Sequence, residues 1–180
     1  MSDQDQKHRA SAAALPDPSL AQAVAPALDS VEVHLVAFLA HRAPNTEISG
    51  TQVFNLSAEG AYWAKPDPKT LVVVFDFELT LGDRREGDEI IELGHHMLKY
   101  QVVYRLTKEH ATWSDQQLES FVSHYGISHV WPYVRAEVQT NNAKLSLPAF
   151  RLPLLRFGQL PARFTIRQHS EADEVDEVDR

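Results

Sequence analysis

The sequence predicts an α+β fold in which a four-stranded antiparallel sheet is followed along the chain by two helices that pack on it. Four segments that alternate apolar and polar side chains come first, and two segments with apolar residues at helical spacing follow them. The alternation leaves one face of each strand polar. This is typical of an antiparallel sheet covered on one face, because parallel strands buried on both faces give unbroken apolar runs.

The two clearest strand candidates lie in the middle of the chain. In residues 71–81, LVVVFDFELTL, every odd position is apolar, whereas Asp76, Glu78 and Thr80 lie on the other face. In residues 96–107 the apolar side chains occupy the even positions, Leu98, Tyr100, Val102, Tyr104 and Leu106. The two segments are therefore expected to be half-buried neighbours.

Two further strand candidates precede them. Residues 51–57 form a short one, with Phe54 and Leu56 on one face. Residues 31–41, VEVHLVAFLAH, are expected to place Val31, Val33, Leu35, Ala37 and Leu39 on one face and Glu32, His34, Val36 and Phe38 on the other. Strands about 36 Å long exceed short helices of about 16 to 21 Å, so part of the sheet is expected to meet another subunit or a ligand.

The first helix is predicted from Ser114, which forms a capping box with Gln117, to a stop at Gly126. Its apolar face consists of Leu118, Phe121, Val122 and Tyr125. The second helix is predicted over residues 128–141, where Pro132 is tolerated in the first turn. Its apolar stripe consists of Val130, Trp131, Val134 and Val138.

The chain divides into an arm, a folded domain and a tail. Residues 1–29 are rich in alanine and proline and predict a flexible arm with one short helix, capped by Ser19 and Gln22. Residues 30–160 are the predicted domain. Residues 161–180 are predicted to be a disordered acidic tail, because the final EADEVDEVDR repels itself and has no apolar face to bury. Its acids are candidate contacts for a basic partner: Glu171, Asp173, Glu174, Asp176 and Glu177.

Charge and composition narrow the classes of partner. With 17 basic and 25 acidic residues the formal charge is −8, so the average surface repels nucleic acid and anionic membranes. No segment approaches the roughly 20 apolar residues of a membrane span, and no secretory signal is recognisable, so a cytoplasmic location is expected. The absence of cysteine excludes disulfides and thiolate zinc sites.

Catalytic and metal motifs are weak. GDRREGD, Gly82–Asp88, resembles a phosphate-binding loop only loosely, since Asp88 stands where a lysine is needed. The nine histidines include His95, His96 and His110, and the pair His124 and His129, but no H-E-x-x-H motif, so we expect no metal and no cofactor. An enzyme on an antiparallel sheet that uses these histidines on a small molecule or metal remains the alternative, and a Ser-His-Asp set is not excluded.

One segment resembles a known family. SHVWPYVRAEVQTNNAKLSLPAFRLPLL, residues 128–155, is similar to SecB protein-export chaperones, in which an aromatic-Pro-aromatic-x-Arg pattern opens a long helix and a leucine- and proline-rich turn follows. The pattern here consists of Trp131, Pro132, Tyr133 and Arg135, then Leu145, Leu147 and Pro148. With the four strand candidates in the family's order, the resemblance covers residues 31–157.

The resemblance implies a dimer of dimers that holds non-native polypeptides in apolar grooves without nucleotide. Export members deliver their clients to the SecA motor, and other relatives guard antitoxins of toxin–antitoxin systems. The positions that match the groove are Phe54, Leu56, Tyr133 and Leu152, and the chemistry of the segment adds Trp131 and Phe150. The N-terminal arm, the insert TKEHATWSDQQ and a phenylalanine-poor C-terminal segment depart from the export members, which bears on delivery to SecA more than on holding.

The same side chains also fit a simpler interpretation. Aromatic residues at helical spacing are usually core, which applies first to Trp131 and Tyr133. Phe150 and Leu152 lie between prolines, where burial is harder, and an exposed apolar groove is a liability unless it has a use.

Overall fold

The computed structural model describes residues 16–44, 47–64, 67–86, 88–155 and 163–168. Four long strands form an antiparallel sheet: β1 (Leu28–Arg42), β2 (Thr51–Ala64), β3 (Thr70–Arg84) and β4 (Ile90–Leu106). The order is β1-β4-β3-β2-β5, in which the short strand β5 (Arg163–Gln168) pairs in parallel with β2. The predicted fold class, a four-stranded antiparallel sheet with helices packed on it, is confirmed.

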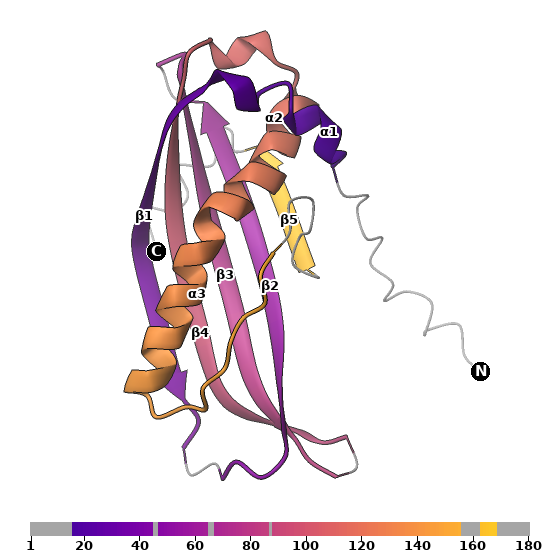
Figure 1. Ribbon diagram of the computed structural model, residues 1–180, viewed down its shortest axis with the longest axis vertical. Coiled ribbons are helices and arrows are strands. Elements are labelled where there is room, and N and C mark those ends of the chain that lie inside the picture. Colours follow the sequence, from indigo (N-terminus) through magenta and orange to yellow (C-terminus); the bar gives the residue numbers. More distant parts are fainter. Residues whose placement is uncertain (1–15, 45–46, 65–66, 87, 156–162, 169–180) are drawn as a thin grey trace, which may run out of the picture.

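The helices lie on one face of this sheet (Figure 1). A short helix α1 (Pro18–Ala21) and a 3₁₀ turn η1 (Ala25–Ala27) precede β1, and a second 3₁₀ turn η2 (His110–Thr112) follows β4. Helix α2 (Asp115–Phe121), a π-helical turn η3 (Val122–Gly126) and the long helix α3 (Ile127–Lys144) then run without a break.

The predicted N-cap is confirmed at α2 and wrong at α1. At α2 the box is present: the Gln117 amide donates to Ser114 Oγ at 3.3 Å, and the Ser114 amide donates to Gln117 Oε1 at 3.0 Å. At α1, the N-cap is Asp17, whose carboxylate accepts from the Ser19 amide, so the assignment to Ser19 and Gln22 was wrong.

The sequence predicted that Gly126 ends the first helix, and this prediction is wrong. Gly126 has helical dihedral angles, and a Cβ there would lie 2.6 Å from Cζ of Phe75. The glycine is therefore needed for close approach of the helix to the sheet, and the helix continues through it.

The interior strands bury the faces that their two-residue period predicts. Alternate residues of β3 and β4 form most of the core, Leu71, Val73, Phe75, Phe77, Leu79, Leu81, Leu98, Tyr100, Val102, Tyr104 and Leu106. α3 packs its predicted stripe against them, with Val130, Trp131, Val134 and Val138 buried. This single layer contact holds the helix over the centre of the sheet.

The edge strand β1 differs from the prediction. Leu35 pairs with Tyr100 and Ala37 pairs with Lys99, so Val36 is an extra residue that forms a bulge. Beyond the bulge the faces exchange: Leu39 turns to the uncovered face, and Phe38 turns to the helix side. The single apolar face predicted for residues 31–41 is therefore wrong, and most of the strand is exposed on both faces.

The ends of the chain differ in part from the predicted division. Residues 163–168 fall in the segment predicted as disordered tail, yet they form β5 along β2. Near the other end, α1 and η1 lie within the predicted flexible arm. Among the described residues, no helix has the length and apolar character needed to cross a membrane.

A buried histidine joins the sheet to the end of α3. His96 on β4 is fully buried, and its Nε2–H donates to Oδ1 of Asn142 at 2.9 Å. Its Nδ1 has no hydrogen-bond partner among the described residues. Burial lowers the pKa of the His96 imidazole, outweighing the bond to Asn142, and the nearby His95 and His41 lower this pKa further.

We expect acid to destabilise the fold through this histidine. Because the pKa of His96 is lower in the folded chain than in the unfolded chain, its stabilising effect is complete above pH of about 6.5 and is lost as the pH falls through the folded pKa. His96→Gln should remove up to about 1.4 kcal/mol per pH unit from the slope of the unfolding free energy between pH 6.5 and 5.5. Urea unfolding at fixed protein concentration measures the slope. His34→Gln, at an exposed histidine, is the matched control, and equal slopes for the wild type and His96→Gln would contradict the assignment.

Candidate functional site

A proline-containing strap, residues 147–155, follows α3 and lies on the helix-covered side of the sheet (Figure 1). Ser146 has a φ of 52°, and the Leu147 amide donates to the carbonyl of Asn142 at 2.9 Å, so the chain reverses direction directly after the helix. Arg42 of β1 donates from Nη1 to the carbonyl of Ser146 at 3.1 Å. The turn is thus fixed at both the helix and the sheet.

Two side chains of α3 hold the strap. Nε1 of Trp131 donates to the carbonyl of Pro153 at 2.9 Å, and Nε of Arg135 donates to the carbonyl of Leu152 at 3.0 Å. The aromatic-Pro-aromatic-x-Arg pattern therefore places two hydrogen-bond donors on the flank of α3 that faces the strap. Both acceptors are backbone carbonyls.

The structure brings Phe54 of β2 and Phe150 of the strap together. Their ring centroids are 4.9 Å apart with the planes at 57°, and the Phe54 side chain is 41% exposed. Leu56 follows Phe54 on the same face of β2 and is buried. Trp131 and Leu152 are also buried, at 3% and 2% exposure. The partly exposed aromatic pair Phe54 and Phe150 therefore lies beside the buried side chains of Leu56 and Trp131, which we call the apolar floor.

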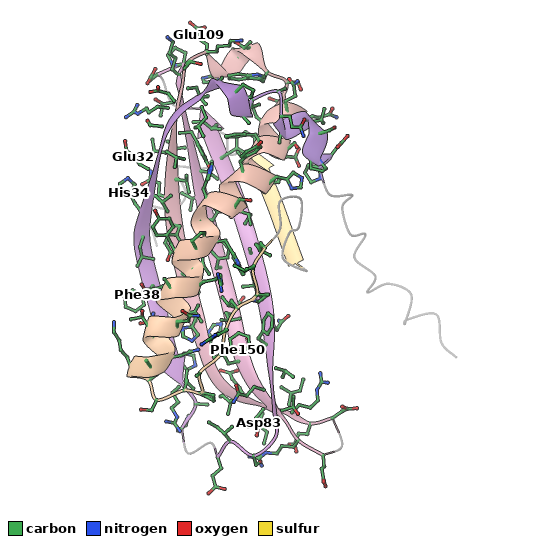
Figure 2. All side chains as sticks on the ribbon, viewed as in Figure 1. Glu32, His34, Phe38, Asp83, Glu109 and Phe150 are labelled. Carbon is green, nitrogen blue, oxygen red and sulfur yellow. The ribbon has the colours of Figure 1, made fainter. Side chains whose placement is uncertain are left out.

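Tyr133 lies on the other flank of α3. It is two residues from Arg135, about 200° around the helix axis, and its side chain is 52% exposed. The structure therefore separates Tyr133 from the other five predicted residues. Phe38 of β1 is also exposed. Figure 2 shows Phe38 and Phe150 on opposite sides of α3, so the flank that carries Tyr133 is the one on the side of β1.

An exposed apolar surface on β1 was missed by the sequence reasoning. It consists of Val31, Leu35, Val36, Phe38 and Leu39. The run LVAFLA, residues 35–40, is apolar at consecutive positions, which a strand buried on one face does not need. That run was the available signal for a strand with apolar side chains on both faces.

The histidines of the alternative hypothesis do not lie together. His95 bonds Glu78 at 2.9 Å on the uncovered face of the sheet, where its ring centroid is 5.5 Å from that of His41. His124 Nε2 donates to the Pro16 carbonyl at 2.9 Å, and His129 Nδ1 shares a hydrogen bond with the Tyr104 hydroxyl at 3.2 Å. Burial lowers the pKa of His129. In the part of the chain that the structure describes, no group of three or more His, Cys, Asp or Glu residues could hold a metal ion.

The phosphate-loop candidate, Gly82–Asp88, comprises the last residues of β3 and part of the connection to β4. Asp83 within it is fully buried, and its carboxylate accepts from the amides of Ser49 at 3.0 Å and Gly50 at 2.9 Å. A Cβ at Gly50 would lie 2.1 Å from the Arg84 carbonyl oxygen, so only glycine permits this approach. The Asp83 carboxylate ties the β1–β2 loop to the β3–β4 hairpin.

The uncovered face of the sheet carries a shallow hollow of about 510 Å³. The residues that line it, through side chains or backbone, are Ala37, Phe38, Leu39, Ser57, Glu59, Asp76, Phe77, Glu78, Met97, Leu98 and Lys99. Lys99 Nζ lies 3.4 Å from Asp76 Oδ1 across neighbouring strands. The tail acids Glu171, Asp173, Glu174, Asp176 and Glu177 lie outside the described residues.

Solved structures provide an informative comparison with known proteins. No protein-family model matches the sequence, and no curated protein matches it. A Mycobacterium tuberculosis SecB-like chaperone, solved in complex with a ChAD peptide from the HigA1 antitoxin, has a TM-score of 0.63 and 15% identity. The match covers 77% of this chain and 97% of that chain.

A second solved structure, a Streptococcus agalactiae protein of unknown function, is 16% identical over 70% of this chain and 100% of that chain. Its TM-score is 0.28, which is too low to indicate a common fold. The resemblance predicted from residues 31–157 is thus confirmed at the level of the fold: this chain has the fold of the SecB-like chaperone of Mycobacterium tuberculosis.

Proposed function

We propose that this protein is an ATP-independent chaperone, a holdase that binds non-native polypeptides and keeps them unaggregated or competent for export. The observation that carries the proposal is the solvent-open pair Phe54 and Phe150 beside a buried apolar floor, on a fold shared with a SecB-like chaperone. The proposed client surface consists of Phe54, Leu56, Trp131, Phe150 and Leu152, with Tyr133 as a separate contact on the other flank of α3.

Holding of this kind needs no chemical step. Apolar burial is non-directional, so one surface accepts many client sequences, and aromatic side chains supply a large area with few rotatable bonds. At about 25 cal/mol per Å², an apolar contact of about 400 Å² contributes on the order of 10 kcal/mol before ordering costs. That is sufficient for reversible binding without nucleotide.

The same comparison supports one class of partner. The similar structure contains an antitoxin peptide, which favours clients of the antitoxin kind over delivery to a SecA motor. We further propose that the acidic tail, Glu171 to Glu177, contacts a basic surface of whichever partner receives the client, and that the protein acts in the cytoplasm.

Phe54→Ser tests the client surface. Removing a ring that is only partly buried should leave the fold intact and weaken client binding roughly tenfold, about 1.4 kcal/mol. The assay is suppression of aggregation of a slowly folding client, followed by light scattering, with circular dichroism as the control on folding. Ile48→Ser is the matched control, because Ile48 is 43% exposed and lies in the loop before β2. Undiminished protection by a folded Phe54→Ser variant would refute the surface.

We also propose that the chain assembles through β1, as a homotetramer built from two dimers. The outer edge of β1 is free along fifteen residues in the described structure, and it exposes large apolar side chains on both faces. Free edges of this length are normally covered, because they otherwise pair with other chains at random.

Light scattering tests the assembly. The wild type should have a mass well above the 20.3 kDa of one chain, and Phe38→Glu should lower the mass, because a carboxylate would be buried at the contact. Ile48→Glu should leave it unchanged. A wild-type mass near 20.3 kDa at micromolar concentration would show that β1 is not an interface.

A further inference from the structure

The strap is held to α3 by contacts that any extended polypeptide could make. The two hydrogen bonds from Trp131 and Arg135 end on main-chain carbonyls, which every residue carries. The apolar side chains of the strap make the other contacts: Leu147 and Leu152 are buried, Leu155 packs against the core, and Phe150 lies on Phe54. Recognition therefore depends on an extended backbone and on apolar side chains two residues apart, rather than on a particular sequence.

Little space remains between the strap and the sheet, although an open hollow of about 390 Å³ lies between α3 and the strap. This hollow is lined by Arg135, Gln139, Asn142, Ala143, Leu147, Ala149, Phe150 and Arg151. The space that remains between Pro148, Phe150 and the sheet residues Leu81, Gly82 and Leu93 measures about 10 Å³. That volume is roughly enough for one water molecule. A client and the strap therefore exclude each other where Pro148 and Phe150 lie on the sheet.

The strap has no backbone hydrogen bonds to the sheet within the described residues 148–155. Pro148 and Pro153 have no amide hydrogen. Arg151 is exposed and Leu154 is 74% exposed. The strap thus lacks the ladder of hydrogen bonds that fixes the strands.

We infer that the strap occupies the client groove as a built-in pseudo-client, and that the groove accepts extended segments with apolar side chains at alternate positions in its place. This inference rests on the proposed holdase function and specifies its substrate class. Because the strap must leave first, the apparent affinity for a client equals the intrinsic affinity multiplied by the fraction of molecules with the strap released. This inference revises the client surface proposed above: Phe150 and Leu152 belong to the strap and compete with clients, and the groove that a client would occupy consists of Phe54, Leu56 and Trp131.

Proteolysis with trypsin tests the exchange without any variant of the protein. The probe is the peptide LPAFQLPLL, which is the strap sequence with glutamine in place of arginine, so that trypsin does not cut it. Cleavage of the Arg151–Leu152 bond, identified by mass spectrometry, should become several-fold faster when the peptide is added. Slower cleavage at saturating peptide would mean that the strap closes over the bound peptide, and an unchanged rate would mean that the peptide does not displace the strap. Either result would overturn the inference.

A strap variant provides the second test. Leu152→Ala weakens the seated strap without altering the groove, so it should bind the labelled peptide roughly tenfold more tightly than the wild type does. Leu154→Ala, in the same strap but exposed, is the matched control and should change affinity by less than about twofold. Circular dichroism checks that both variants are folded. Weaker or equal binding by folded Leu152→Ala would place Leu152 in the groove wall and refute the competition.

The two levels of the proposal fail separately. In one outcome, the wild type suppresses client aggregation while neither the cleavage rate at Arg151 nor the peptide affinity of Leu152→Ala changes as expected. That result would support the holdase function and refute the role of the strap as a pseudo-client. If neither the wild type nor Leu152→Ala holds any unfolded protein, the proposed function itself falls.

Discussion

The apolar face of the sheet is wider than the one long helix that packs on it, and the rest of the structure depends on this mismatch. The axes of four strands span about 14 Å, and their side chains extend further, whereas a helix is about 10 Å wide. α3 covers the centre, and the strap covers the floor beside Phe54 and Leu56. On the other flank, Val31, Leu35 and Phe38 of β1 stay exposed.

This incomplete cover connects the fold to the proposed function. An apolar surface that the chain cannot cover permanently is an aggregation hazard unless something else binds it. We infer that a strap without backbone hydrogen bonds to the sheet is a replaceable cover, held by two donors on α3 and by the side chains of Leu147, Phe150 and Leu152. The same two donors suit an incoming polypeptide, because its carbonyls are chemically identical to those of the strap.

Sequence reasoning predicted the parts of the fold that depend on local pattern. The two-residue period of β3 and β4 and the capping box at Ser114 are local, and both are present. The bulge at Val36 depends on the register with β4, and the role of Gly126 depends on the distant Phe75, so neither could be predicted from a local window. β5 was missed although FTI in RFTIRQ alternates, because the acidic residues after it dominated the composition.

The candidate site was predicted only in part, because spacing along the chain does not show which flank of a helix faces which strand. Phe54 and Phe150 are 96 residues apart in the sequence, yet their rings are in contact. Tyr133 and Trp131 are two positions apart and lie on different flanks of α3.

Site-specific crosslinking tests the central claim, that clients bind at this surface, most directly. Because the chain contains no cysteine, Phe54→Cys gives a unique attachment point for a photoreactive label, with Ile48→Cys as its control. The account predicts that an unfolded client crosslinks efficiently from position 54 and only weakly from position 48. Equal crosslinking from the two positions, or none from position 54 in a protein that suppresses aggregation, would contradict it.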